Sequence, residues 1–163
     1  MVTNNAMDSS SPLVQIVYAS KSAYQLLSTV MNAGDVIPTN VAGDEILTLA
    51  ITPKRTTNIL VIEFSTMLQQ KNNSDSSEFA LFQDATANAL SATRGVGASS
   101  SDVAICYLRH IMVAGTTAAT TFKIRGGPEA AGNAIAVNGD INALARRFGG
   151  VAATFLTIKE YFA

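Results

Sequence analysis

The residues that could carry out chemistry are few and widely spaced. His110 is the only histidine and Cys106 the only cysteine. Both lie in a stretch with β-strand alternation, where four residues span roughly 13 Å, too far for a nucleophile–base pair. With a single histidine, any histidine-based acid–base pair must use His110, and one chain cannot supply several histidines to a metal site. We therefore favour a buried, structural Cys106 and a structural His110. A cluster of three His110 side chains around a threefold axis is the alternative, and it would be sensitive to pH.

The carboxylates fall mostly in segments predicted to be loops. A glycosidase needs two carboxylates roughly 5 to 9 Å apart across a cleft. The chain has no tryptophan and no aromatic cluster to stack on a sugar ring. Gly95-Val96-Gly97 lacks the strand–loop–helix context of a phosphate loop. We expect no enzymatic activity, no metal site and no cofactor.

The most unusual stretch is Arg146-Arg147-Phe148-Gly149-Gly150. Adjacent arginines in an extended chain point to opposite sides, so one of them could pair bidentately with a carboxylate such as Asp84 across a subunit interface. The two glycines permit a bulge just before the last strand. An interface role is our prediction, and a solvated turn is the alternative.

Composition favours one domain that associates with copies of itself. The chain has 163 residues, of which only 14% are charged, against about 25% in ordinary soluble domains. A surface poor in charge is often covered in an oligomer. A monomer with a surface rich in alanine, serine, threonine and asparagine is the other interpretation.

Charge and hydropathy argue against several partners. The net charge is −1 and no basic cluster is present, so we expect no nucleic-acid binding. The longest apolar runs are far shorter than the roughly 20 residues that span a bilayer, so we expect no membrane insertion. The polar N-terminus does not resemble a secretory signal. The lone cysteine fits assembly in a reducing cytoplasm.

Short alternating segments separated by turn residues predict an all-β fold. We expect eight or nine strands and no long amphipathic helix, which is typical of an antiparallel β-sandwich or jelly roll. Residues 1–12 read as an extended arm and residues 13–163 as a single domain. The expected strands cover 13–18, 24–31, 46–51, 58–68, 78–83, 103–113, 120–125, 133–137 and 151–161, with a turn at Gly126-Gly127-Pro128 and loops at 69–77, 91–102 and 126–133.

The segment 58–68 begins with residues that are apolar on both faces, Ile59 to Ile62. In an antiparallel fold this suggests that one face packs on the core and the other on a second copy. In the segment 103–113, His110 lies opposite the more apolar face. The candidate residues of a trimer interface are Ile59, Val61, Cys106, His110, Arg146, Arg147 and Phe148. The candidate residues of exposed binding loops are Asn72, Asn73, Asp75, Arg94, Asp102 and Glu129.

Several blocks, in order over roughly residues 35–163, resemble phage tail-fibre and head-fibre domains. The blocks are Ile51-Thr52-Pro53, Ala80 to Asp84 with Thr86 to Ala89, Leu108 to Thr117 leading into Thr120 to Arg125, Ala145 to Val151, and Ile158 to Tyr161. The resemblance implies a virion protein whose domain is a compact antiparallel jelly roll. It further implies a homotrimer similar to the tumour-necrosis-factor-like and complement-like globular heads.

The resemblance leaves two roles within one class. Only about 12 to 30 residues precede the domain, which is short for a fibre shaft, so we expect a capsid decoration or cement protein or a separate fibre tip. Its partners would be itself and the major capsid or tail protein, on a virion assembled in the host cytoplasm. The alternative is a tail-fibre tip that binds a host surface glycan or protein. A soluble carbohydrate-binding module is a third possibility from another class.

Overall fold

Alternating apolar residues arrange this chain into antiparallel sheets in a computed structural model, which describes residues 12–71, 76–95 and 102–163. The long strands are β1 (Leu13–Lys21), β3 (Asp44–Ile51), β4 (Ile59–Gln70), β5 (Ser77–Gln83), β6 (Ser91–Gly95), β7 (Ala104–Val113), β8 (Thr120–Pro128) and β12 (Thr154–Tyr161). The short elements are β2 (Gln25–Leu27), β9 (Ile135–Val137), β10 (Gly139–Asp140), β11 (Ala145–Arg146) and the 3₁₀ helix η1 (Phe148–Gly150). The predicted all-β fold is confirmed. No helix in the described residues is long and apolar enough to cross a bilayer.

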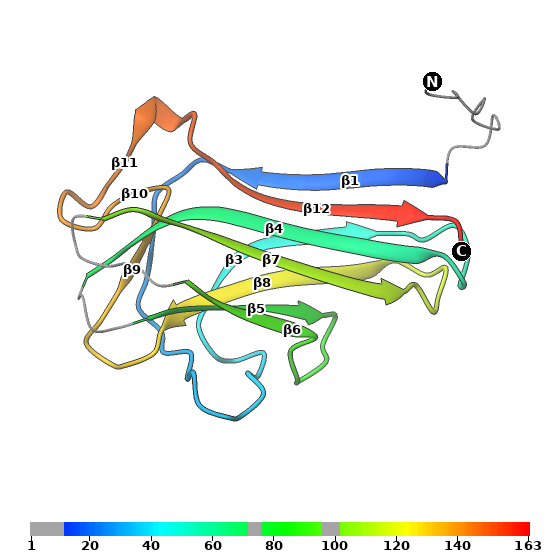
Figure 1. The fold of residues 1–163 in the computed structure, drawn as a ribbon, viewed down its shortest axis with the longest axis horizontal. Coiled ribbons are helices and arrows are strands. Elements are labelled where there is room, and N and C mark those ends of the chain that lie inside the picture. The colour runs from blue at the N-terminus through cyan, green and yellow to red at the C-terminus, as the bar shows by residue number, and fades with distance from the viewer. Residues whose placement is uncertain (1–11, 72–75, 96–101) are drawn as a thin grey trace, which may run out of the picture.

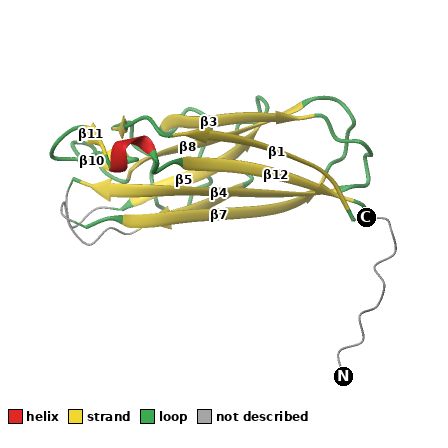
Figure 2. Ribbon diagram, turned by 90° about the horizontal axis from the view of Figure 1, so that it is seen from above, coloured by secondary structure: helices red, strands yellow, loops and turns green. Residues whose placement is uncertain are grey.

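The long strands form two layers, as the view from above shows (Figure 2). One sheet has the order β1-β12-β4-β9-β2, with β7 also paired to β4, and the other has the order β3-β8-β5-β6. The first and last strands are neighbours: β12 lies between β1 and β4 (Figure 1). The long pairs are nested along the chain, since β1 pairs with β12, β3 with β8, β4 with β7 and β5 with β6.

The core lies between the two sheets. Phe64 of β4 and Phe79 of β5 are both fully buried, and their ring centroids are 5.7 Å apart. Leu156 and Ile158 of β12 join the same apolar cluster. Because successive side chains on a strand point to opposite faces, every second residue of β4 and β12 enters this core.

A second, smaller apolar cluster lies on the other face of the β3-β8-β5-β6 sheet. Ala80 and Phe82 of β5 alternate with the core residues Phe79 and Leu81, and Met31 packs on them together with Ala42. The segment between β2 and β3 therefore covers the outside of this sheet with residues of the same chain.

One predicted loop and one predicted turn differ from the structure. The predicted loop at 91–102 begins with strand β6, and Gly126-Gly127-Pro128 is the end of β8 rather than a turn. The glycine at 127 is required by close packing, because a Cβ there would overlap the carbonyl oxygen of Thr29. The predicted arm lies outside the described residues except for Pro12, whose carbonyl accepts a 2.8 Å hydrogen bond from the Phe162 amide.

A buried carboxylate ties the last strand to two other parts of the sandwich. Glu160 is fully buried and accepts hydrogen bonds from the Lys54 amide (2.7 Å), Asn58 Nδ2 (2.6 Å) and Gln15 Nε2. Burial raises the pKa of Glu160, but the hydrogen bonds outweigh burial and hold the pKa below its ordinary value of 4.5. Glu160 is therefore ionised and fully paired in the folded state.

We predict that Glu160→Gln costs about 3 kcal/mol of unfolding free energy at neutral pH, because an amide leaves some of these donors without an acceptor. A carboxylate with a lowered folded pKa stabilises the fold above its unfolded pKa, and this contribution is lost as the pH falls through the folded value. The gap between wild type and variant should therefore narrow below about pH 4.5. Urea unfolding between pH 7 and pH 3 measures this, and a gap that is constant over the range would contradict the assignment.

Candidate interaction surface

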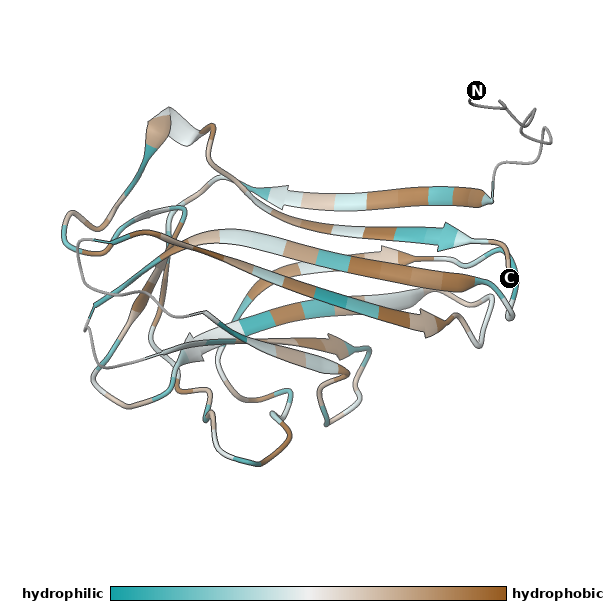
Figure 3. Ribbon diagram, viewed as in Figure 1, coloured by the Kyte–Doolittle hydropathy of each residue, from teal (hydrophilic) through white to brown (hydrophobic). Residues whose placement is uncertain are grey.

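The outer face of the sheet formed by β1, β12, β4 and β7 is unusually apolar. Figure 3 shows the hydrophobic stretch at the start of β4 and the hydrophobic residues along β1 and β7. On this face Ile105 is 80% exposed and Tyr18 is 70% exposed. Five further large apolar side chains of the face are between 45% and 54% exposed: Ile16, Tyr107, Ile111, Val113 and Phe155.

Strand register brings these residues into continuous rows. Val61 lies between Lys159 of β12 and Ile111 of β7, and Ile16 of β1 extends the row beyond Lys159. Ile59 begins the next row, beside Tyr161 and opposite Val113. Exposed apolar patches of this continuity mark interaction sites in soluble proteins.

A small polar group lies in the middle of the face. Glu63 accepts hydrogen bonds from Lys159 Nζ at 2.7 Å and from the Tyr107 hydroxyl at 2.8 Å. These two bonds, Lys159 first, hold the pKa of Glu63 below its ordinary value. Arg109 is paired with Glu63 in the strand register and adds a long side chain that can reach the rim of an interface. The Glu63 carboxylate therefore keeps its hydrogen-bond partners from its own chain if another surface covers it.

One end of the face is hollowed and lies next to a projecting turn. The hollow has a volume of about 260 Å³ and is lined by Met67, Ile105, Phe155 and the alanines 152 and 153. Just before these alanines, Phe148 is 70% exposed and Val151 is 86% exposed. Phe148 has φ 52°, a conformation that is uncommon for a bulky residue.

The structure distributes the predicted interface residues over three places. Ile59 and Val61 lie on the outer face, and Phe148 lies on the projecting turn with Arg146 and Arg147. Arg147 pairs with Asp140 of the same chain, whereas the Asp84 carboxylate accepts a 2.8 Å hydrogen bond from the Thr121 amide. The suggested pair between one of these arginines and Asp84 joins two subunits and stays a prediction.

Cys106 and His110 lie on the opposite face of β7 from the exposed apolar residues. Cys106 is 2% exposed within the core, and burial raises its pKa to about 12. His110 pairs in register with the core residue Ile62, and burial lowers its pKa. The less apolar face of 103–113, which carries Cys106 and His110, is the one that packs inward. Register with β4 places Leu108 beside Phe64, and this turns that face into the core.

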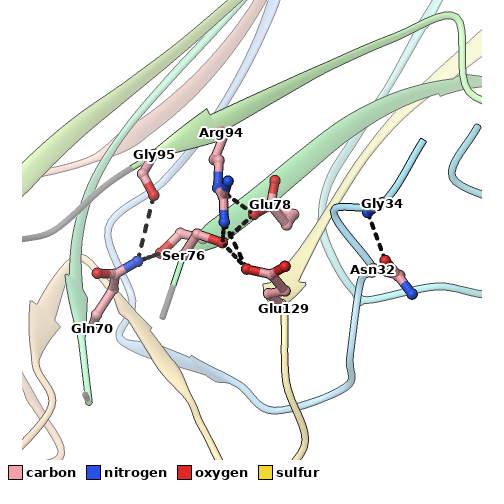
Figure 4. Close-up of polar contacts among 9 residues, drawn as sticks. Asn32, Gly34, Gln70, Ser76, Glu78, Arg94, Gly95 and Glu129 are labelled. Carbon is pink, nitrogen blue, oxygen red and sulfur yellow. Dashed lines mark hydrogen bonds and ion pairs between the residues drawn. The ribbon is translucent and has the colours of Figure 1, made fainter. Parts of the chain in front are cut away.

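The predicted loop residues Arg94 and Glu129 meet (Figure 4). Glu129 directly follows β8 outside any strand, whereas Arg94 lies on a strand. Arg94 projects from β6; its Nη2 lies 2.6 Å from Glu129 Oε2 and its Nε lies 3.1 Å from Glu78 Oε1. The Ser76 hydroxyl lies between the two carboxylates and accepts a 2.6 Å hydrogen bond from Arg94. The cluster fastens β6 and β5 to the end of β8, and its charged groups are engaged with one another.

The remaining loop candidates have different outcomes. Asn72, Asn73 and Asp75 lie outside the described residues, and Asp102 is exposed just before β7. Within the described residues, no group of three or more histidine, cysteine or acidic side chains could hold a metal ion. No family model matches this chain, and no curated protein matches it either.

We predict that Arg94→Met lowers the unfolding free energy by about 1 to 2 kcal/mol, because the mostly buried Glu78 loses its cation while the aliphatic stem is kept. Glu129→Gln is the matched control and should cost about 0.5 kcal/mol or less, because its carboxylate is far more exposed than that of Glu78. Urea denaturation measures both values. Equal costs for the two variants would contradict the central role of the Arg94–Glu78 pair.

Proposed function

We propose that this chain is a non-enzymatic structural protein of a phage virion that assembles as a homotrimer of jelly-roll domains on the particle surface. The observation that carries the proposal is the exposed apolar outer face of the β1-β12-β4-β7 sheet. A stable interface buries about 800 Å² on each partner and has an apolar centre with a polar rim. A sheet face with seven large apolar side chains that are between 45% and 80% exposed suits such an interface.

The strand order supports the jelly-roll description. When the eight long strands are numbered along the chain, one sheet reads 1-8-3-6 and the other reads 2-7-4-5. This order results when a long antiparallel ribbon, with strands paired 1–8, 2–7, 3–6 and 4–5, rolls into a sandwich. Eight strands in two sheets are the usual content of a jelly roll.

The trimer is favoured by the arrangement of the surface. The hollow beside Phe155 and the projecting Phe148 are two different surfaces of one chain. If Phe148 of one copy sits in the hollow of the next copy, the contact joins two different surfaces and is therefore heterologous. Heterologous contacts that close generate rings, of which the threefold ring is a common form. The blocks that resemble phage fibre domains support the same stoichiometry. Within the virion, we favour a cement role on the capsid. A fibre tip is the second candidate role.

We expect light scattering of the purified chain to give a mass of about three times 17.1 kDa. Ile111→Asp should shift the mass to that of a monomer, because a carboxylate at a half-exposed site has no favourable place in an apolar interface. Val41→Asp is the matched control: Val41 is 78% exposed but follows β2, away from the face. A wild-type monomer, or a trimer that survives Ile111→Asp, would overturn assembly through this face.

The virion role has a separate test. We expect peptides of this chain in mass spectra of purified phage particles from the genome that encodes it. Particles from which the gene is deleted should adsorb normally and disassemble at a lower temperature. Normal stability with lost adsorption would support the fibre tip instead, and absence of the peptides from the particles would overturn the virion assignment.

A further inference from the structure

A second hollow lies on the other sheet, away from the proposed interface. Its volume is about 490 Å³, within the range of small-ligand sites, and Phe82 forms part of its lining. Polar side chains from three segments surround it: Lys123 and Arg125 of β8, Asp84 after β5, and Asn40 from the segment that covers the sheet.

The hollow contains two cations on one face of β8. Lys123 and Arg125 are two residues apart and therefore roughly 7 Å apart along the strand. Arg125 is fixed in place, since its Nε and Nη2 donate to the carbonyls of Ala42 and Gly43 at 2.8 and 2.6 Å. Its Nη1 has a distant carboxylate, Glu45, at 3.9 Å. Among the described residues Lys123 forms no ion pair within 4 Å.

The same hollow contains two fixed acceptors. Asp84 has φ 49°, and both its amide and one carboxylate oxygen are bound to the backbone of Thr121 at 2.8 Å. Asn40 Nδ2 donates to the carbonyls of Ala85 and Thr86 at 3.3 and 3.2 Å. These two bonds hold the side-chain amide in place, and its oxygen is then the atom that can accept a hydrogen bond from a ligand. Two cations for an acid group and two held acceptors for hydroxyl groups thus meet in one place.

We propose that this hollow binds a polyhydroxy carboxylate such as a uronic acid, with the carboxylate on Lys123 and Arg125 and the hydroxyl groups on Asp84 and Asn40. Charge-assisted hydrogen bonds to a carboxylate are about twice as strong as neutral ones. Since the hollow and the apolar face lie on different sheets, the site stays open when the face is covered. The proposal does not depend on the assembly or on the virion role.

The test is a titration of the full-length protein with glucuronate, followed by amide chemical shifts in two-dimensional NMR, with glucose as the uncharged counterpart. We expect shifts confined to Asn40 and to residues 82–85 and 121–125, a Kd of about 1 mM and at least tenfold weaker binding of glucose. No shifts with glucuronate, or equal binding of glucose, would overturn the proposal. Equal binding of acetate would overturn the role of the hydroxyl groups.

Variants assign the binding to the hollow. Lys123→Gln should weaken glucuronate binding about tenfold, because one charge-assisted hydrogen bond is lost, whereas Lys123→Arg should retain it. Lys71→Gln is the matched control, because Lys71 is an exposed lysine at the end of β4. Equal loss in Lys123→Gln and Lys71→Gln would show a general charge effect and overturn the site. Tighter binding of a uronic-acid oligomer than of glucuronate would identify a polysaccharide as the source of the ligand. Equal binding of the two would identify a free acid. Either outcome supports the site.

Discussion

The insertion of β12 between β1 and β4 is the constraint on which the rest of the structure depends. Leu156 and Ile158 enter the core while Phe155 and Lys159 lie on the outer face. A slip of one residue would exchange these two sets and place a lysine in the core. The hydrogen bonds of the buried Glu160 lie at the end of this strand and oppose such a slip. Because β12 joins β1 to β4, both faces of this sheet depend on its register.

The same alternation that builds the core also builds the candidate interface. On β7, Leu108 and Cys106 face inward while Ile105, Tyr107 and Ile111 face outward, so the strand is apolar on both sides. Strands of this kind are usual where both faces are covered. In a two-layer sandwich one of those faces is at the surface, and its burial then requires a second molecule. The central Glu63, already bonded to Lys159 and Tyr107, allows such burial without an unpaired carboxylate.

Much of the fold could be predicted from periodicity, and most of the site could not. The pattern of 58–68 indicated β4, and the turn residues indicated a sandwich. Which face of 103–113 points inward depends on its register with β4, and both faces are apolar, so the local sequence holds no signal for it. Arg94 and Glu129 are 35 residues apart and meet only because β6 and β8 flank β5. Gly127 reads as a turn residue, but it is needed where Thr29 passes close to the strand.

The outer face of one sheet is covered by a segment of the same chain, and the outer face of the other is not. This difference supports the proposal of an external partner. The apolar residues outside the β3-β8-β5-β6 sheet, Ala80 and Phe82, are covered by Met31 and Ala42 of the segment that crosses them. The chain thus carries its own cover where that sheet needs one. On the other sheet, no described segment crosses the larger apolar surface around Val61 and Ile111. Since burial of apolar area is the main favourable term in association, the proposed trimer would cover this surface with a second copy of the chain.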